Sequence, residues 1–247
     1  MEKTEYLEDI SSAFGNCCCA AFTLRHGGCS KAPYDSFNLG LHVGDQEAAV
    51  LANRALLSKS FGLPCVYMAQ THSTRVSLVE AWTGTAVPAD ALVTGTPGVA
   101  LAVLTADCLP LLLCSADGRV VAAVHCGWRG VYGNICAEAL DLMRTLSTAP
   151  VLAYLGPCIR LESYEVGPEI CAKFCEVLPG AAQAFRPGKG DRMWCDLPLL
   201  CRMRLENCGV TEITDSGHDT FAENSRFFSW RRSKITGRMA SIIALKN

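Results

Sequence analysis

Short apolar runs separated by turn-forming residues follow one another along most of the chain, and this pattern predicts extensive β-structure. The runs are rich in Val, Leu, Ile and Ala, and Gly, Pro, Asn or Asp lies between many of them. Runs of this length and composition are typical of buried strands. We expect strands at residues 17–24, 66–68, 76–79, 99–105, 109–114, 119–125, 151–155, 227–230 and 238–245.

Other segments carry apolar residues three or four positions apart, which predicts helices. These segments are residues 47–61, 131–146, 168–178 and 197–208. Gly62 and Gly209 follow the first and the last segment, and Pro168 opens the third, where such residues end or start helices. Because strands and helices are intermixed without a linker or repeat, we expect residues 1–247 to form one domain of mixed α/β (α+β) class.

Composition narrows the range of functions. The chain has 247 residues, 50% of them hydrophobic and 19% charged, with a net charge near −2. There is no basic excess that would attract nucleic acid or an anionic membrane. No apolar run reaches the roughly 18 residues that span a bilayer, and the acidic first ten residues lack the pattern of a signal peptide. We expect a cytoplasmic protein that binds neither nucleic acid nor membranes.

The 15 cysteines are unusual in number, but their pattern does not indicate a disulfide framework. Their number is odd, the chain is long enough to form its own core, and no export signal precedes them. No C-x-x-C pair occurs, which argues against a zinc ribbon or an iron–sulfur cluster. We expect most of them to pack as small apolar side chains.

Two of these residue types meet in a predicted hairpin. Residues 115–118 form a turn with the Asp-Gly signature, and a regular antiparallel pairing around it places Cys108 opposite His125. Their β-carbons would then lie about 5 Å apart. A thiol and an imidazole at this distance suit two ligands of one metal, or a thiol hydrogen-bonded to an imidazole. Pro110 cannot donate to the ladder and is able to shift this register.

A catalytic zinc site has three protein ligands and one open position. His72 is the candidate for the third ligand because it follows a short predicted strand in a loop. Each residue also has an ordinary structural role open to it, as a hydrogen-bonded histidine or a buried cysteine.

Several longer motifs occur together with these three residues. They are Asn38-Leu39-Gly40, Gln70-Thr71-His72, Asp90-Ala91-Leu92-Val93-Thr94, Thr105-Ala106-Asp107-Cys108-Leu109-Pro110, His125-Cys126-Gly127-Trp128-Arg129-Gly130, Gly156-Pro157-Cys158-Ile159, Tyr164-Glu165-Val166-Gly167 and Phe228-Ser229-Trp230-Arg231-Arg232. In this order, over about residues 20–245, they resemble the YfiH/YlmD family, also called laccase-domain proteins or multicopper polyphenol oxidases.

The resemblance implies a zinc site made of His72, Cys108 and His125 in an α-β-β-α sandwich related to deamidating bacterial toxins. It implies phosphorolysis of adenosine, inosine, guanosine and methylthioadenosine, and hydrolytic deamination of adenosine. The partners would be purine nucleosides and phosphate. The older oxidase label implies copper, which a thiolate site is able to bind. The chain has 5 histidines, too few for the trinuclear cluster of a true laccase.

Roles for further residues follow from these expectations. Asp107 and Glu165 are candidates for proton transfer, and Asp107 is equally a candidate partner of a histidine ligand. Arg129 lies in a Gly-flanked loop before a helix, where it would bind and stabilise an anion during catalysis. Asn38 and Arg54 are weaker candidates for substrate binding, with turn formation and solvation as their ordinary roles. Asp219 stands where many relatives carry a cysteine.

Two other functions remain open at this point. In a metal-free hydrolase, Cys108 would be a thiolate nucleophile and His125 its base, acting on an amide or peptide such as a cell-wall precursor. A metal- or nucleoside-binding regulatory protein without turnover is the second, although the three-ligand site argues against it. We expect a monomer or a small homo-oligomer.

Overall fold

The computed structural model describes residues 4–246. One layer of the molecule is a five-stranded sheet that is covered on both faces. Its central strands are therefore apolar on both sides. Its strands, in spatial order, are β1 (Leu7–Asp9), β2 (Cys18–Thr23), β14 (Met239–Leu245), β6 (Ala100–Thr105) and β3 (Cys65–Tyr67). β3 runs parallel to β6, and the other neighbours are antiparallel.

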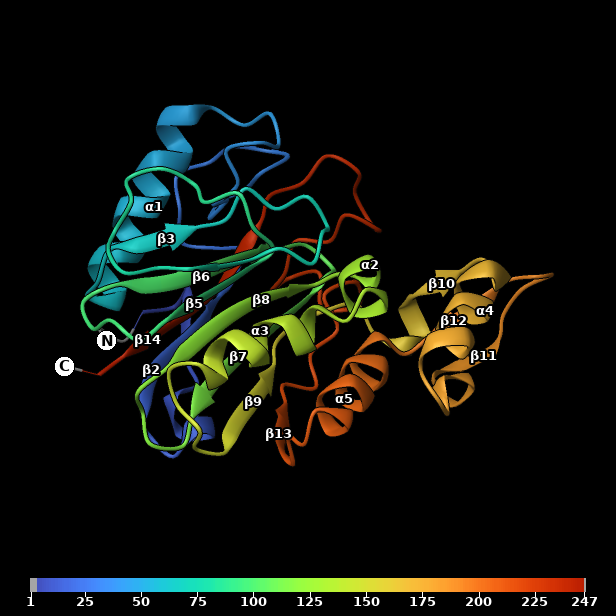
Figure 1. Cartoon of the computed structure of the whole chain (residues 1–247). Coiled ribbons are helices and arrows are strands. Elements are labelled where there is room, and N and C mark those ends of the chain that lie inside the picture. The colour runs from blue at the N-terminus through green and yellow to red at the C-terminus, as the bar shows by residue number, and fades with distance from the viewer. Residues whose placement is uncertain (1–3, 247) are drawn as a thin grey trace.

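A six-stranded sheet packs against the first sheet (Figure 1). Its strands, in spatial order, are β13 (Glu212–Asp215), β9 (Val151–Leu155), β7 (Leu109–Ser115), β8 (Val121–Cys126), β5 (Ala91–Thr94) and β4 (Val76–Leu78). Leu101 of β6 and Leu112 of β7 belong to the same buried cluster between the sheets. The β6–β7 connection therefore passes from one sheet to the other.

Helices cover the two outer faces. α1 (Glu47–Phe61) packs on the five-stranded sheet through Leu57 and Phe61. α2 (Trp128–Tyr132), α3 (Ile135–Arg144) and α5 (Leu197–Asn207) cover the six-stranded sheet. The mixed α/β class and the expected α-β-β-α sandwich are confirmed. Within residues 4–246, no helix has the length and apolar character needed to cross a bilayer.

A small lobe projects from one side of the sandwich (Figure 1). It contains a three-stranded sheet, β10 (Glu165–Val166), β12 (Met193–Cys195) and β11 (Phe185–Pro187), together with α4 (Pro168–Val177). The short 3-10 helices of the chain are η1 (Ser11–Phe14), η2 (Leu161–Ser163) and η3 (Ala181–Ala184). The lobe begins after β9 and ends where α5 returns to the sandwich.

Most predicted elements lie within two residues of their observed bounds, and two predictions are wrong. The helix expected at 131–146 is divided into α2 and α3, since Asn134 has a left-handed backbone with φ of 64°. Residues 227–230 form no strand; Phe227 and Phe228 are fully buried in a loop that fills the core between the sheets. An apolar run alone does not distinguish a strand from a buried loop of this kind. β1, β5, β13 and the three-stranded sheet of the lobe were not predicted as strands.

Arg204 of α5 holds the lobe and the sandwich together. Its guanidinium donates to the carbonyls of Val131 and Tyr132 at the end of α2, at 3.1 and 2.8 Å, and to that of Val177 at the end of α4, at 3.2 Å. The residue is 8% exposed. Its donors satisfy carbonyls that helix ends leave unpaired.

We expect Arg204→Met to keep the packing of the side-chain stem but to leave these carbonyls unpaired. The free energy of unfolding should fall by about 3 kcal/mol, and the Tm by about 6–12 °C. Thermal unfolding followed by circular dichroism measures this. Arg202→Met on the same helix, whose one hydrogen bond is 3.5 Å long, is the control; equal losses in both variants would contradict the assignment.

Candidate metal centre

His72, Cys108 and His125 come together at one end of the six-stranded sheet. Each offers a ligand atom, and these atoms all lie within 4.8 Å of one another. The Cys108 Sγ is 3.7 Å from His72 Nε2. His72 lies in the loop between β3 and β4, Cys108 immediately precedes β7, and His125 is on β8. The three predicted ligands are thus brought together from three separate segments.

The route by which the hairpin predicted two of them needs correction. In the observed register, His125 pairs with Pro110 and Val121 pairs with Cys114. The register is therefore shifted by two residues from the predicted one, and Cys108 lies just beyond the last pair of the ladder. The turn begins one residue later than expected, because Ser115 pairs with Val120. Two residues is one full period of a strand, so the shift leaves both side chains on the same side of the sheet.

A single buried carboxylate orients both histidines. Asp90, fully buried, accepts a 2.9 Å hydrogen bond from His125 Nδ1 and a 3.0 Å bond from the backbone N–H of His72. It also accepts bonds from the backbone and hydroxyl groups of Thr71 and Ser73. His72 has a φ of 61°, an unfavourable conformation that these bonds hold in place. With Nδ1 engaged, His125 presents Nε2 to Cys108 and His72.

The electrostatics of the group favour a thiolate at Cys108, the form in which cysteine binds metals. Burial raises the pKa of the Cys108 thiol, but the charge and hydrogen bonding of His125, together with His72, outweigh it and lower the pKa to about 6. Burial lowers the pKa of His125, whereas Cys108 and Asp90 raise it to about 9. Burial opposes ionisation of Asp90, but hydrogen bonds from His125, Ser73 and Thr71 hold its pKa well below the usual range. Asp90 is therefore a carboxylate at any ordinary pH.

This donor set fits zinc. Tetrahedral zinc, with Zn–N near 2.0–2.1 Å and Zn–S near 2.3 Å, spaces N and S ligand atoms about 3.5 Å apart, close to the observed 3.7 Å between His72 Nε2 and Cys108 Sγ. Gly127 leaves room for them, because a Cβ there would lie 3.0 Å from His72 Cδ2 and 3.2 Å from Cys108 Sγ. Three ligands with a carboxylate behind one imidazole are the usual composition of a catalytic zinc site.

The three residues open into a cavity of about 400 Å³. Its walls contain the aromatic rings of Trp128, Tyr164 and Trp230 and the guanidinium groups of Arg129, Arg231 and Arg238. Cavities of this size, largely apolar with a few convergent polar groups, are typical of small-molecule sites. The sandwich, the lobe and the 230–238 loop all contribute to the walls.

Two other predicted site residues line the same cavity. Arg129 is exposed, with its guanidinium 4.6 Å from the centre of the Trp128 ring. Asp107 is buried, and both carboxylate oxygens are engaged, by the Thr220 hydroxyl at 2.8 Å and the Arg231 N–H at 2.6 Å. Asp107 is therefore not the carboxylate partner of a histidine ligand, a role that belongs to Asp90.

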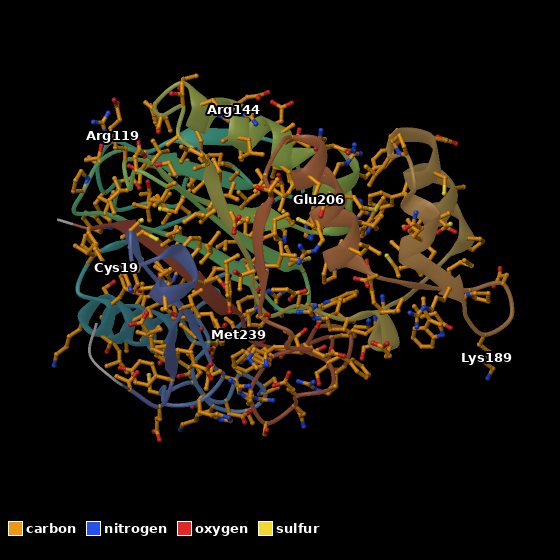
Figure 2. The ribbon with its side chains drawn as sticks, turned by 90° about the horizontal axis from the view of Figure 1, so that it is seen from below. Cys19, Arg119, Arg144, Lys189, Glu206 and Met239 are labelled. Atoms are coloured by element: carbon orange, nitrogen blue, oxygen red, sulfur yellow. The ribbon has the colours of Figure 1, made fainter. Side chains whose placement is uncertain are left out.

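The remaining predicted site residues lie outside the cavity lining. Asn38 is fully buried and holds a turn through bonds with Gly40 and Asp45. Arg54 donates to the Leu39 carbonyl and stacks on Tyr67. The Glu165 carboxylate accepts from the N–H of Lys189, which Figure 2 shows at the tip of the lobe.

Sequence reasoning missed several residues of the cavity. His42, an exposed residue, was not among the predicted site residues, but it lines the wall together with Arg238. Asp219 stands where many relatives carry a cysteine. Its carboxylate accepts a 2.6 Å hydrogen bond from the Ser163 hydroxyl and so stabilises the loop. Eight of the 15 cysteines are buried, and Cys126, Cys136 and Cys201 form a second close group inside the apolar core.

Known proteins resemble this chain along most of its length. A family model described as multi-copper polyphenol oxidoreductase laccase matches residues 19–246. The chain belongs to this family. YfiH of Escherichia coli, named a purine nucleoside phosphorylase, is 41% identical over 228 residues, 92% of this chain and 93% of that protein. A purine nucleoside phosphorylase of Haemophilus influenzae is 42% identical over 225 residues, 90% and 91% of the two chains.

Solved structures of YfiH-family proteins share the fold. A Neisseria meningitidis protein superposes with a TM-score of 0.91 at 39% identity, covering 98% of this chain and 100% of that one. YlmD from Geobacillus stearothermophilus has a TM-score of 0.92 at 30% identity, covering 100% and 98%. The resemblance that the sequence motifs indicated is thus confirmed along the whole chain.

We expect Asp90→Asn to impair the metal centre. The amide keeps the shape of the carboxylate but carries no charge, and its NH2 group faces groups that also donate. Zinc affinity, measured by competition with a chromogenic chelator, should fall about 10- to 100-fold. The free energy of unfolding should fall by about 3 kcal/mol. Asp117→Asn, in the β7–β8 turn, is the control, and wild-type zinc affinity in Asp90→Asn would contradict this role.

Proposed function

We propose that the protein is a zinc-dependent purine nucleoside enzyme. Its reactions would be phosphorolysis of adenosine, inosine, guanosine and methylthioadenosine, and hydrolytic deamination of adenosine. The observation that carries the proposal is one cavity that joins a three-ligand candidate metal centre to aromatic walls and to guanidinium groups that form no salt bridge within residues 4–246. The names of relatives about 40% identical over nine-tenths of the chain support the same substrate class.

The cavity suits a nucleoside in shape and chemistry. Its roughly 400 Å³ accommodate a purine base with its ribose. Trp128, Tyr164 and Trp230 offer flat apolar faces against which a purine ring is able to stack. Because Tyr164 comes from the lobe and Trp128 from α2, substrate would bind between the two parts.

His72, Cys108 and His125 would hold the zinc ion, which supplies Lewis-acid catalysis when bound. Asp90 keeps the His125 ring oriented and its Nε2 free for the metal. Thiolate also binds copper. A laccase needs many more histidines than the five in this chain, of which the candidate centre contains two. His26 contacts the Ser225 carbonyl, and His218 contacts the Glu223 carboxylate.

In phosphorolysis, an oxygen of phosphate bonds to the ribose C1′ while the C1′–N9 bond breaks. The electron pair of that bond passes to the purine, which leaves after taking up a proton. The cavity arginines would bind the phosphate and stabilise its charge. Asp107 remains the candidate for proton transfer in the cavity wall, although release of its carboxylate from Thr220 or Arg231 would have to come first.

A metal-free thiol hydrolase is the second candidate function, and one observation favours it. Cys108, His125 and Asp90 have the order of a catalytic triad, with the pKa of the thiol lowered to about 6 and that of the imidazole raised to about 9. Such a chain would act on an amide or a peptide and would need no zinc.

We expect Cys108→Ala and His125→Ala to lose metal and activity together while the fold survives. Zinc content per chain should drop, and phosphate-dependent release of hypoxanthine from inosine should fall at least about 100-fold. Circular dichroism checks the fold, and Cys175→Ala, at an exposed position of α4, is the matched control. Near wild-type release in either variant would rule out the zinc mechanism.

Removal of the metal separates the two candidate functions. Stripping zinc with a chelator should abolish hypoxanthine release, and added zinc should restore it, because activity depends on the ion. A thiol hydrolase would instead stay active after chelation and would be silenced by iodoacetamide at Cys108. Peptide mass spectrometry locates the alkylated cysteine, and activity that survives chelation would favour the hydrolase.

A further inference from the structure

Arg238 is a cavity residue that the metal centre does not use. It immediately precedes β14 and is half-buried. Its Nη1 donates to the carbonyls of Thr236 and Gly237, both at 3.0 Å. Within residues 4–246, its Nε and Nη2 groups have no protein acceptor, and the guanidinium makes no salt bridge with a carboxylate. A guanidinium held in this way keeps two donors for an anion in the cavity.

The surrounding turn fixes where this guanidinium points. The Arg238 backbone N–H donates to Asn38 Oδ1 at 2.9 Å, and its carbonyl accepts from Leu39 at 3.1 Å. Gly40 lies so close that a Cβ there would be 2.8 Å from Arg238 Cγ. Asn38 therefore acts as a positioning residue for Arg238. The position of this arginine is built into the fold before any ligand arrives.

His42, from the same turn, lies on the cavity wall beside Arg238. Burial lowers the pKa of His42, and the positive charges of Arg238 and Arg54 lower it further. Among the nearby acids, Asp45 is bound by the Asn38 amide at 2.9 Å, and Asp107 by Thr220 and Arg231. Burial lowers the pKa of Arg238, and the negative charges of Cys108 and Asp107, which do not pair with it, only partly oppose this shift.

The other two cavity arginines are less suited to hold an anion. Arg129 is exposed and stacks on Trp128. Arg231 stacks on Tyr164, and its Nη1 donates to the Glu165 carbonyl at 2.8 Å, so it joins the loop to the lobe. Arg238 combines partial burial, a fixed backbone and free donors.

We propose that Arg238 and His42 form an oxyanion subsite that holds inorganic phosphate as the co-substrate, in the role that the sequence indicated for Arg129. The assignment rests on the proposed phosphorolysis. Two parallel N–H···O bonds from Nε and Nη2 suit a tetrahedral oxyanion. Phosphate held there keeps one oxygen free to bond to the ribose C1′, while the C1′–N9 electron pair leaves with the protonated purine.

The first test measures binding of inorganic phosphate alone to the zinc-loaded protein by calorimetry. Arg238→Gln should weaken phosphate binding about 10- to 100-fold, since charge-assisted hydrogen bonds are lost. Arg238→Lys keeps the positive charge but loses the paired N–H donors. Its phosphate affinity should lie between those of the wild type and Arg238→Gln. Arg119→Gln, 79% exposed at a distant turn (Figure 2), is the matched control. Zinc content and circular dichroism verify that each variant is folded.

The second test is kinetic. In Arg238→Gln the KM for phosphate should rise about 10- to 100-fold, while the KM for inosine stays within about twofold. His42→Gln, a milder change, should raise the phosphate KM about threefold to tenfold. Unchanged phosphate binding and KM in the Arg238 variants would overturn the subsite.

Two further results separate the possible failures. If the wild-type protein binds phosphate through Arg238 but releases no hypoxanthine, the subsite stands and the proposed phosphorolysis fails. If Arg238→Gln leaves phosphate binding unchanged but weakens binding of inosine 5′-monophosphate, the anion is the phosphate group of a nucleotide, and the co-substrate assignment is overturned.

Discussion

The metal centre depends on one buried carboxylate. Asp90 has no exposed surface and accepts six hydrogen bonds from Thr71, His72, Ser73 and His125. A buried charge is tolerated when it is this fully bonded, and an uncharged residue would leave several donors unsatisfied. The same charge holds the His72 segment in an unfavourable backbone conformation and orients the His125 ring. Two of the three candidate ligands are thus positioned by a residue outside the ligand set.

Strand register brings this carboxylate to its partners. Asp90 immediately precedes β5, whose first residue, Ala91, pairs with Val124 of β8, and the His125 N–H donates to the Asp90 carbonyl at 2.8 Å. A slip of one residue between β5 and β8 would turn the His125 side chain to the other face of the sheet. The apolar residues that fix this register, such as Leu92 and Ala123, lie in the core between the sheets. Core packing therefore determines the geometry of the candidate ligands.

This dependence explains what the sequence could and could not predict. Strands, helices and the three ligands have local signals: periodicity, caps, and motifs of ligand-type residues. Asp90 opens one of the motifs that carry the family resemblance, but its role has no local signal, because its partners are 17 to 35 residues away in the chain. The position of the Glu165 carboxylate could not be predicted for a related reason. It adjoins Tyr164, which lines the cavity, but its own carboxylate is held near Lys189. Successive side chains in extended backbone point in opposite directions.

The two large sheets contribute different halves of the cavity. The six-stranded sheet carries His125 and adjoins Cys108, whereas Arg238 directly precedes β14 of the five-stranded sheet. The distance between the candidate metal centre and the proposed oxyanion subsite is consequently set by how the sheets pack. Phe228, fully buried at this end of the core, lies against Gly237 and so supports the backbone that carries Arg238. Residues 227–230, the apolar run that forms no strand, therefore have a different structural role. They help to fix the relative position of the two sheets at the edge of the cavity.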